Sequence, residues 1–371
     1  MMSARFLTVV LERAFNMRDG FGREIDYMRI SVIDSCNLNC YYCNPCGNNE
    51  HCHALNILSV KEVLCIVRAA TRLGIKHFRL TGGEPLLHPQ LDEMVLQIKK
   101  IPGVSSVSLT TNAVLLAQHA KWLKEAGIDS INVSLDTIDA SEYERITKKP
   151  LLEEVKHGIN AAIECGIRVK INVVLTPQTD VVALTRYVAK KGTDIRFIEM
   201  MPVGEGHTNG VEPYKKVIGT LSKLYGEPCR INTEKTKEIN SGNDKREIPD
   251  NGPAEYYIFP ELGIRVGLIQ AIHGKFCDTC NRIRVTADGR LMPCLGSSVT
   301  MDLVPDSWDF ADDVEKDFAI VRALRAAIKA KPRCHNFNDN AVTYTKTTET
   351  KTTEIEAAEV NAARNMSRIG G

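Results

Sequence analysis

A regular alternation of strand-like and helix-like segments fills the sequence between residues 27 and 201. Six short apolar segments occur there, and amphipathic segments with helical periodicity separate them. Such an alternation predicts right-handed strand–helix–strand units and a parallel sheet. A complete eightfold barrel takes about 250 residues. About 200 residues with six strands therefore favour a partial, open βα barrel, and a flat doubly wound sheet is the alternative.

The expected elements can be given by their residues. The first strand begins at Tyr27, and the others cover 77–81, 104–112, 130–136, 167–175 and 195–201. Helices are expected over 59–73, 89–100, 115–126, 140–147, 152–165 and 180–191. After these come two short strands near 255–259 and 263–268 and a helix over 313–330. In either architecture, polar residues at the C-terminal ends of the strands are the functional candidates.

These patterns divide the chain into four parts. Residues 1–16 are expected to be a variable extension, and residues 17–203 to form the barrel. Residues 204–340 are expected to form a C-terminal region with a second cysteine set, and residues 341–371 a polar segment with a Gly-Gly tail.

Three cysteines follow the first strand at a C-x-x-x-C-x-x-C spacing. They are Cys36, Cys40 and Cys43. Three thiolates on a short loop can hold three irons of a cubane cluster, because soft sulfur ligands suit iron–sulfur clusters. The fourth iron then stays open, and an open metal position is a binding site. A zinc loop or a set of buried thiols is the alternative.

A second set, Cys277, Cys280 and Cys294, also has three members. A structural zinc site takes four ligands, and His273 or Cys334 could supply the fourth. Arg282 and Arg284 would point to the same side of an extended segment. A second open cluster beside two guanidinium groups suits a ligand with both a soft-metal donor and phosphates. The alternative for the arginines is a solvated face.

Four cations fall inside the predicted strands: Arg29, Arg79, Lys170 and Arg196. Charged residues are rarely buried without a partner. Four inward cations would repel one another, and a triphosphate would relieve that repulsion. In the alternative arrangement they point outward and are covered by carboxylates of the helices.

Composition narrows the possible partners and compartment. The 47 basic residues balance 46 acidic ones, so no global field draws the chain to nucleic acid or to a membrane. Twelve cysteines in 371 residues do not fit a small secreted disulfide scaffold. No apolar run approaches the roughly 20 residues of a membrane span, and the patch from Phe6 to Leu11 is too short and too closely followed by charge for a signal peptide. We expect a reducing, cytoplasmic setting.

The order of these motifs resembles the radical S-adenosylmethionine (SAM) superfamily. The three-cysteine loop is followed, after the second strand, by Gly82-Gly83-Glu84-Pro85. With RFIEMMPVG, FCDTCNRIRVTADGRLMPCL and a terminal Gly370-Gly371, the chain is similar to the GTP 3′,8-cyclases, the family of molybdenum cofactor biosynthesis protein A. The similarity runs from about residue 17 to 330 and resumes at the last eight residues. It implies a TIM-like partial barrel of the radical SAM type, which a C-terminal cysteine-containing extension closes.

That resemblance implies a radical enzyme that cyclises GTP. In the family, one [4Fe-4S] cluster with SAM gives a 5′-deoxyadenosyl radical, which takes the ribose C3′ hydrogen of GTP. Carbon C3′ then attacks guanine C8, and 3′,8-cyclo-7,8-dihydro-GTP results, in the first step of molybdenum cofactor biosynthesis. A second [4Fe-4S] cluster binds the guanine.

The resemblance also implies roles for single residues. The cluster ligands would be Cys36, Cys40, Cys43, Cys277, Cys280 and Cys294. SAM would contact Tyr42, Gly83, Glu84, Ser134 and Met201. GTP would contact Arg29, Arg79, Thr110, Lys170, Arg196, Arg282 and Arg284. Arg282 and Arg284 would be catalytic, with Gly370 and Gly371 of a tail that inserts into the active site.

The resemblance also implies partners: cyclic pyranopterin monophosphate synthase as the downstream enzyme, a reduced electron donor of the flavodoxin or ferredoxin type, and a second copy of the chain in a homodimer.

Some residues depart from the family pattern: Cys46 and Cys52 match no ligand of the family, and residues 331–360 match poorly. Two rival functions stay open. One is another radical SAM enzyme with an auxiliary cluster, such as a peptide-maturing one. The other is a non-enzymatic iron–sulfur or zinc scaffold.

Overall fold

Six parallel strands form the centre of one curved sheet. The computed structural model describes residues 17–43, 56–202, 213–231, 252–297, 299–303, 313–335 and 337. The central strands pair in chain order, and each is parallel to the next. They are β1 (Tyr27–Ser31), β2 (His77–Thr81), β3 (Ser106–Thr111), β4 (Ser130–Ser134), β5 (Arg168–Leu175) and β6 (Asp194–Glu199).

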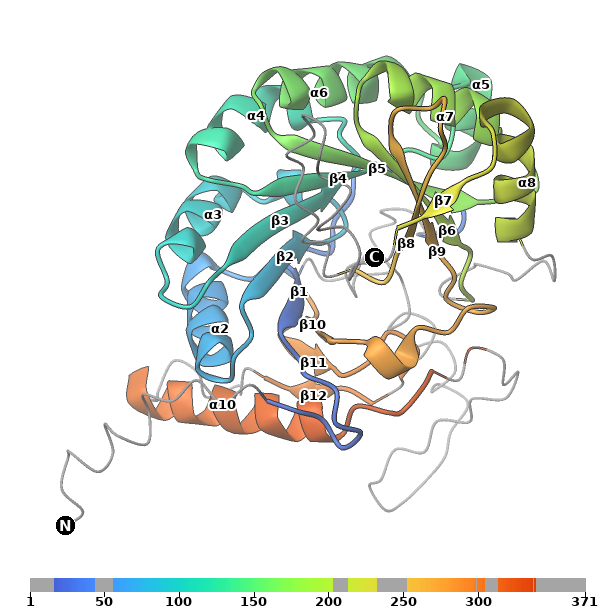
Figure 1. Cartoon of the computed structure of the whole chain (residues 1–371). Helices are drawn as coiled ribbons and strands as arrows, with labels where there is room; N and C mark the ends of the chain where they lie inside the picture. The colour runs from blue at the N-terminus through green and yellow to red at the C-terminus, as the bar shows by residue number, and fades with distance from the viewer. Residues whose placement is uncertain are drawn as a thin grey trace, which may run out of the picture.

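Helices between the strands cover the outer, convex face of this sheet (Figure 1). Ser59 and Glu62 form the expected capping box at the start of the first of them. The helices are α2 (Val60–Arg72), α3 (Leu91–Lys99), α4 (Leu116–Glu125), α5 (Ala140–Thr147), α6 (Leu152–Glu164) and α7 (Val181–Lys190), with a short 3-10 turn η1 (Pro85–Leu87) after β2. The predicted strands and helices have ends within two residues of the observed ones.

The C-terminal region extends the sheet at both edges. After α8 (Pro213–Tyr225) come β7 (Cys229–Arg230), β8 (Glu255–Ile258) and β9 (Arg265–Ile269). Strand β9 is parallel to β6, and β8 and β7 follow it antiparallel. Then come η2 (Cys277–Thr279), β10 (Arg282–Val285), β11 (Arg290–Met292), β12 (Met301–Asp302) and α10 (Asp313–Lys329).

Strand β10 is parallel to β1, at the opposite edge from β9. The segment between β9 and β10 therefore crosses the open side of the barrel, and Figure 1 shows it there. This confirms the partial barrel with a C-terminal extension. The sequence did not predict α8, β7, β11 or β12, nor the pairing of 282–285 with the first strand.

The two sides of the central strands differ in polarity. Met28 and Ile30 of β1, and Phe78 and Leu80 of β2, are fully buried and belong to the core under the helices. The alternate residues, such as Arg29, face the inside of the barrel. The apolar side of each strand drives packing against helices, and the polar side is left for a site. None of the described helices combines the length and apolar composition that a membrane crossing requires.

We expect Gly158→Ala to lower the free energy of unfolding by about 1–3 kcal/mol. A Cβ at this position of α6 would lie 2.4 Å from the Ala113 carbonyl oxygen, in the turn after β3. Gly219 of α8 is a matched control, because a Cβ there meets no atom within 4 Å. Gly219→Ala should gain about 0.5–1 kcal/mol through helix propensity. Denaturant unfolding measures both, and equal effects would contradict the packing argument.

Candidate functional site

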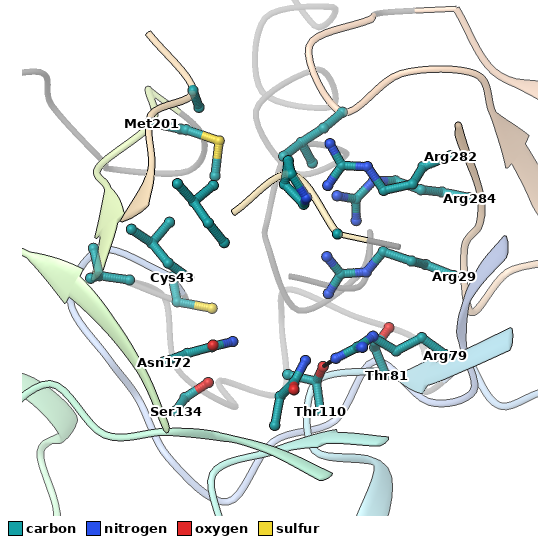
Figure 2. Close-up of a pocket in the computed structure, with 18 of the residues that line it drawn as sticks. Arg29, Cys43, Arg79, Thr81, Thr110, Ser134, Asn172, Met201, Arg282 and Arg284 are labelled. Carbon is teal, nitrogen blue, oxygen red and sulfur yellow. Dashed lines mark hydrogen bonds between the residues drawn. The ribbon is translucent and has the colours of Figure 1, made fainter. Parts of the chain in front are cut away.

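A cavity of about 300 Å³ occupies the concave side of the barrel. All six cysteines of the two predicted sets line it, together with residues from the C-terminal ends of the central strands. In Figure 2, Arg29, Arg79, Arg282 and Arg284 lie on one wall, and Cys43 and Met201 lie on the opposite wall. The strand ends thus bring thiols and guanidinium groups to one space, as expected for a βα barrel.

The first cysteine loop is held by the Gly82-Gly83 turn after β2. The Gly83 amide donates to the Ile33 carbonyl (2.7 Å), and the Glu84 amide donates to the Ser35 carbonyl (2.8 Å). A Cβ on Gly83 would lie 2.2 Å from the Ser35 carbonyl oxygen. Only glycine permits this close approach, so the turn fixes the backbone that leads into Cys36.

Glu84 ties that turn to the end of β3. Its buried carboxylate accepts hydrogen bonds from the Leu86 amide (3.1 Å), the Thr111 hydroxyl (2.6 Å) and the Asn112 amide (2.7 Å). Burial raises the pKa of Glu84 to about 7, although these bonds oppose the shift. Asn112 in turn donates its side-chain amide toward Cys36 Sγ (3.8 Å). Glu84 therefore orders the loop, and its direct contact with SAM stays a prediction.

Asp136 follows β4 and is paired with the tyrosine of the first cysteine loop. Tyr42 donates its hydroxyl to Asp136 Oδ2, and the Val174 amide donates to Oδ1 (2.8 Å). Burial raises the pKa of Asp136 to about 6. The pair joins the cysteine loop to the end of β4 and to β5, and both of its residues line the cavity.

Three arginines form a row across neighbouring strands. Arg284 of β10, Arg29 of β1 and Arg79 of β2 share one register level. Strands lie about 4.8 Å apart, so the three side chains are close together. Burial and the charge of Arg284 lower the pKa of Arg29 well below its usual range, and burial and Arg282 lower that of Arg284 to about 10. The row is thus an anion site under mutual repulsion.

Polar neighbours orient the arginine row. Arg79 donates Nε to the Tyr27 hydroxyl and Nη1 to the Thr110 hydroxyl (3.4 Å). Burial opposes ionisation of Tyr27, but the charges of Arg79 and Arg29 outweigh it and lower its pKa. These contacts hold the guanidinium of Arg79 toward the cavity (Figure 2).

Across the barrel, Arg196 of β6 donates Nε to Asn172 Oδ1 (2.9 Å). Gly267 is its register partner on β9, and a Cβ there would lie 2.7 Å from the Arg196 side chain. The glycine therefore makes room for a buried guanidinium. Lys170 is also buried, but it is not part of the cavity wall. It pairs in register with Asp194 on one side and with the lining residue Asn132 on the other.

The second cysteine set lies on the segment that crosses the open side. Cys277 is the first residue of the turn η2, Cys280 directly follows that turn, and Cys294 follows β11. Arg282 stacks its guanidinium 4.8 Å from the Phe276 ring centre. Arg282 and Arg284 both line the cavity, which confirms that they point to one side. The solvated-face alternative is wrong for this pair.

The donors present fit two iron–sulfur clusters better than zinc. Each set offers three sulfurs to the same cavity. Within the described part of the chain, no three His, Cys, Asp or Glu side chains are arranged to hold a single metal ion. His273 is engaged with Glu199, and Cys334 is exposed outside the cavity lining, so neither serves as a fourth zinc ligand here.

Most of the predicted site residues meet in this cavity. Its lining includes Tyr42, Gly83, Glu84, Ser134, Met201, Arg29, Arg79, Thr110, Arg196, Arg282 and Arg284. Gly370, Gly371, Cys46 and Cys52 lie outside the described residues. Sequence reasoning missed the lining residues Tyr27, Asn132, Asp136, Asn172 and Lys331. The first four lie two positions from a predicted residue, and period-two polarity could have found them.

Two family models match most of this chain. The model described as the radical SAM superfamily matches residues 30–183. The model described as Molybdenum Cofactor Synthesis C matches residues 193–337. The first range carries one cysteine set, and the second range carries the other.

Whole-length relatives are similar over nearly the same range. A GTP 3′,8-cyclase of Clostridium perfringens (strain SM101) is 35% identical over 324 residues, which cover 86% of this chain and 95% of that protein. A GTP 3′,8-cyclase of Petrotoga mobilis is 36% identical over 331 residues, 87% of this chain and 96% of that protein.

Solved structures share the fold. Streptococcus suis SuiB matches with a TM-score of 0.55 at 14% identity, over 81% of this chain and 68% of that one. The structure called anSMEcpe with bound AdoMet matches with a TM-score of 0.51 at 17% identity, over 82% and 84%. At such low identity these likenesses speak for the fold alone.

The raised pKa of Asp136 predicts a pH-dependent stability. Between about pH 4 and pH 6 the folded chain keeps a proton on Asp136 that the unfolded chain has lost. The free energy of unfolding therefore falls as pH rises through this window, by up to about 3 kcal/mol from this group. Asp136→Asn removes the contribution, so its stability should fall less between pH 4 and pH 7 than that of the wild type. Parallel denaturation profiles of the cluster-free proteins would contradict this.

Proposed function

This chain belongs to the GTP 3′,8-cyclase family of radical SAM enzymes, and from that premise we propose how its cavity binds and converts the reactants. It is a GTP 3′,8-cyclase of molybdenum cofactor biosynthesis. A [4Fe-4S] cluster and SAM are the cofactors that its superfamily implies. The assignments of single residues below are proposals.

Cys36, Cys40 and Cys43 would hold the SAM-binding cluster. When bound, the cluster and SAM supply a 5′-deoxyadenosyl radical, the species that removes hydrogen from the substrate. The chain's own part is to place SAM. The turn at Gly83 contributes by fixing the backbone that leads into this loop, because a Cβ there would meet the Ser35 carbonyl oxygen. Tyr42, Ser134 and Met201 line the same region of the cavity and would complete the SAM site.

The arginine row would bind the triphosphate of GTP. Arg284, Arg29 and Arg79 share a register level on adjacent strands, and Arg282 lies beside them. Guanidinium groups donate paired hydrogen bonds to phosphate oxygens, and an anion relieves the repulsion within the row. Thr110 would add a hydroxyl contact. Arg196, on the far wall, would contact the nucleotide from the opposite side.

Cys277, Cys280 and Cys294 would hold a second [4Fe-4S] cluster, which binds guanine. With the triphosphate fixed at the arginines and the base at this cluster, the ribose would lie between them, facing the first cysteine set. Such a placement would hold ribose C3′ on the side of the SAM site and guanine C8 close to C3′. The single observation that carries this proposal is that both cysteine sets and the arginine row line one cavity.

Other partners and the cellular setting remain proposals. The electron donor would be of the flavodoxin or ferredoxin type, and cyclic pyranopterin monophosphate synthase would use the product. A reducing cytoplasm would keep the thiols available. Lys170 stays a predicted contact to GTP, although it does not line the cavity, and the Gly370-Gly371 tail stays a predicted part of the active site.

Cys277→Ser should abolish GTP cyclisation and leave SAM cleavage intact, because it alters only the guanine-side cluster. The assay uses anaerobically reconstituted enzyme, dithionite, SAM and GTP, and follows 5′-deoxyadenosine and the cyclised nucleotide. We expect cyclised product to fall by about 100-fold or more. Equal loss of both products would contradict the division of roles. Wild-type protein that consumes a peptide but not GTP would overturn the proposed function.

Arg284→Ala should weaken GTP binding by about 10–100-fold, since it removes charge-assisted hydrogen bonds to phosphate. Guanosine, which has no phosphate, should bind the variant and the wild type alike. Arg230 is a control, because it is exposed and pairs with Glu255 outside the cavity. Equilibrium binding to the reconstituted enzyme measures the effect, and equal losses for GTP and guanosine would exclude a phosphate role.

A further inference from the structure

Arg23 lies in a tight turn just before β1. Asp19 Oδ1 accepts hydrogen bonds from the amides of Phe21 (2.9 Å) and Arg23 (3.0 Å), and Gly22 takes a positive φ of 81°. Arg23 Nε donates to Asp19 Oδ2 (2.5 Å), and the two side chains are 6% and 0% exposed. A buried ion pair adds little net stability, so this one calls for another explanation.

The rest of the Arg23 guanidinium reaches the second cysteine set. Nη1 donates to the carbonyl of Cys277 (2.7 Å) and to that of Arg333 (2.9 Å), while Nη2 donates to that of Pro332 (2.6 Å). These acceptors lie 254, 310 and 309 residues away in sequence. One rigid group therefore fastens the N-terminal turn, the Cys277 turn and the segment after α10 to one another.

A second buried cation holds the other two cysteines. Lys331 is 3% exposed, and its Nζ donates to the carbonyls of Arg282 (2.8 Å) and Pro293 (2.9 Å). Pro293 immediately precedes Cys294, and Arg282 lies two residues after Cys280. Each cysteine of the set is thus within two residues of a carbonyl that Arg23 or Lys331 fixes.

We infer that Asp19, Arg23 and Lys331 form a clamp whose task is to position Cys277, Cys280 and Cys294. They are positioning residues, because Arg23 and Lys331 donate to backbone carbonyls beside the cysteines and Asp19 holds Arg23, although Lys331 also lines the cavity. Loops that carry metal ligands need such outer contacts to keep sulfur positions fixed. The inference also gives a role to residues 331–333, which belong to the stretch expected to match the family poorly but lie inside the second family match. It rests on the proposed function in so far as these cysteines hold a cluster.

The clamp can be tested through iron content. After anaerobic reconstitution, the wild type should hold about eight irons per chain, and Arg23→Met about four. The variant should still cleave SAM, because the first cysteine loop has no contact with the clamp. Arg18→Met is the matched control, since Arg18 is exposed on the same turn. Arg23→Lys keeps the positive charge but not the several N–H donors of the guanidinium group. It should therefore hold more iron than Arg23→Met and less than the wild type.

A second measurement does not depend on any cluster. In the iron-free chain, Cys277 is buried, and alkylation of each cysteine can be followed by peptide mass spectrometry. Loss of several hydrogen bonds from a charged donor should raise the alkylation rate of Cys277 by about tenfold or more in Arg23→Met, and leave Cys36 unchanged. Lys331→Met should do the same for Cys294, next to the Pro293 carbonyl that Lys331 holds.

The outcomes separate this inference from the proposed function. A wild type with about four irons would count against the proposed second cluster, while the alkylation rates would still decide the clamp. Full iron and unchanged alkylation in Arg23→Met would overturn the clamp. So would equal loss of both clusters with faster alkylation of every cysteine, because that pattern means general unfolding.

Discussion

The division of each central strand into an apolar outer side and a polar inner side is the constraint on which this structure depends. In a closed eightfold barrel the interior is packed with branched apolar side chains. Here the arc of parallel strands is wider and open, and its inner side carries residues such as Arg29, Thr110 and Asn172. The helices bury the other side, where Met28, Phe78 and Phe197 have almost no exposed surface. Stability and function are thereby placed on opposite sides of the same strands.

The inner side of the strands brings the positive charges of Arg29, Arg79 and Arg284 together in a cavity that is partly shielded from water. Burial and the neighbouring arginines lower the pKa values of Arg29 and Arg284, because both disfavour the charged forms. Strand pairing fixes the backbone positions of the three arginines side by side. If the row binds a polyphosphate, as proposed, the binding energy would be available for positioning the rest of the nucleotide.

The sequence predicted the barrel well because its signals are local. Periodicity, the Ser59 capping box and the glycines at 82 and 83 act over a few residues, and they fixed the elements and the first cysteine loop. The pairing of strands far apart in sequence could not be predicted. The local sequence RIRV at 282–285 contains no signal that this segment pairs with β1. The sequence also did not show which of the strand cations line the cavity. Lys170 and Arg29 look alike in sequence, but Arg29 lines the cavity and Lys170 does not.

The pairing of β10 with β1 has a consequence for the timing of synthesis. Strand β1 leaves the ribosome early, but its second neighbour follows roughly 250 residues later, which at about 5–20 residues per second is roughly 12–50 s. Until then, one edge of β1 presents unpaired N–H and C=O groups, the kind of edge that recruits other strands and leads to aggregation. The nascent chain can assemble its first cysteine loop long before it can shield that edge. Strand β10, which carries Arg282 and Arg284 into the cavity, thus also covers the exposed edge of β1 and ends the period in which the nascent chain is most prone to aggregate.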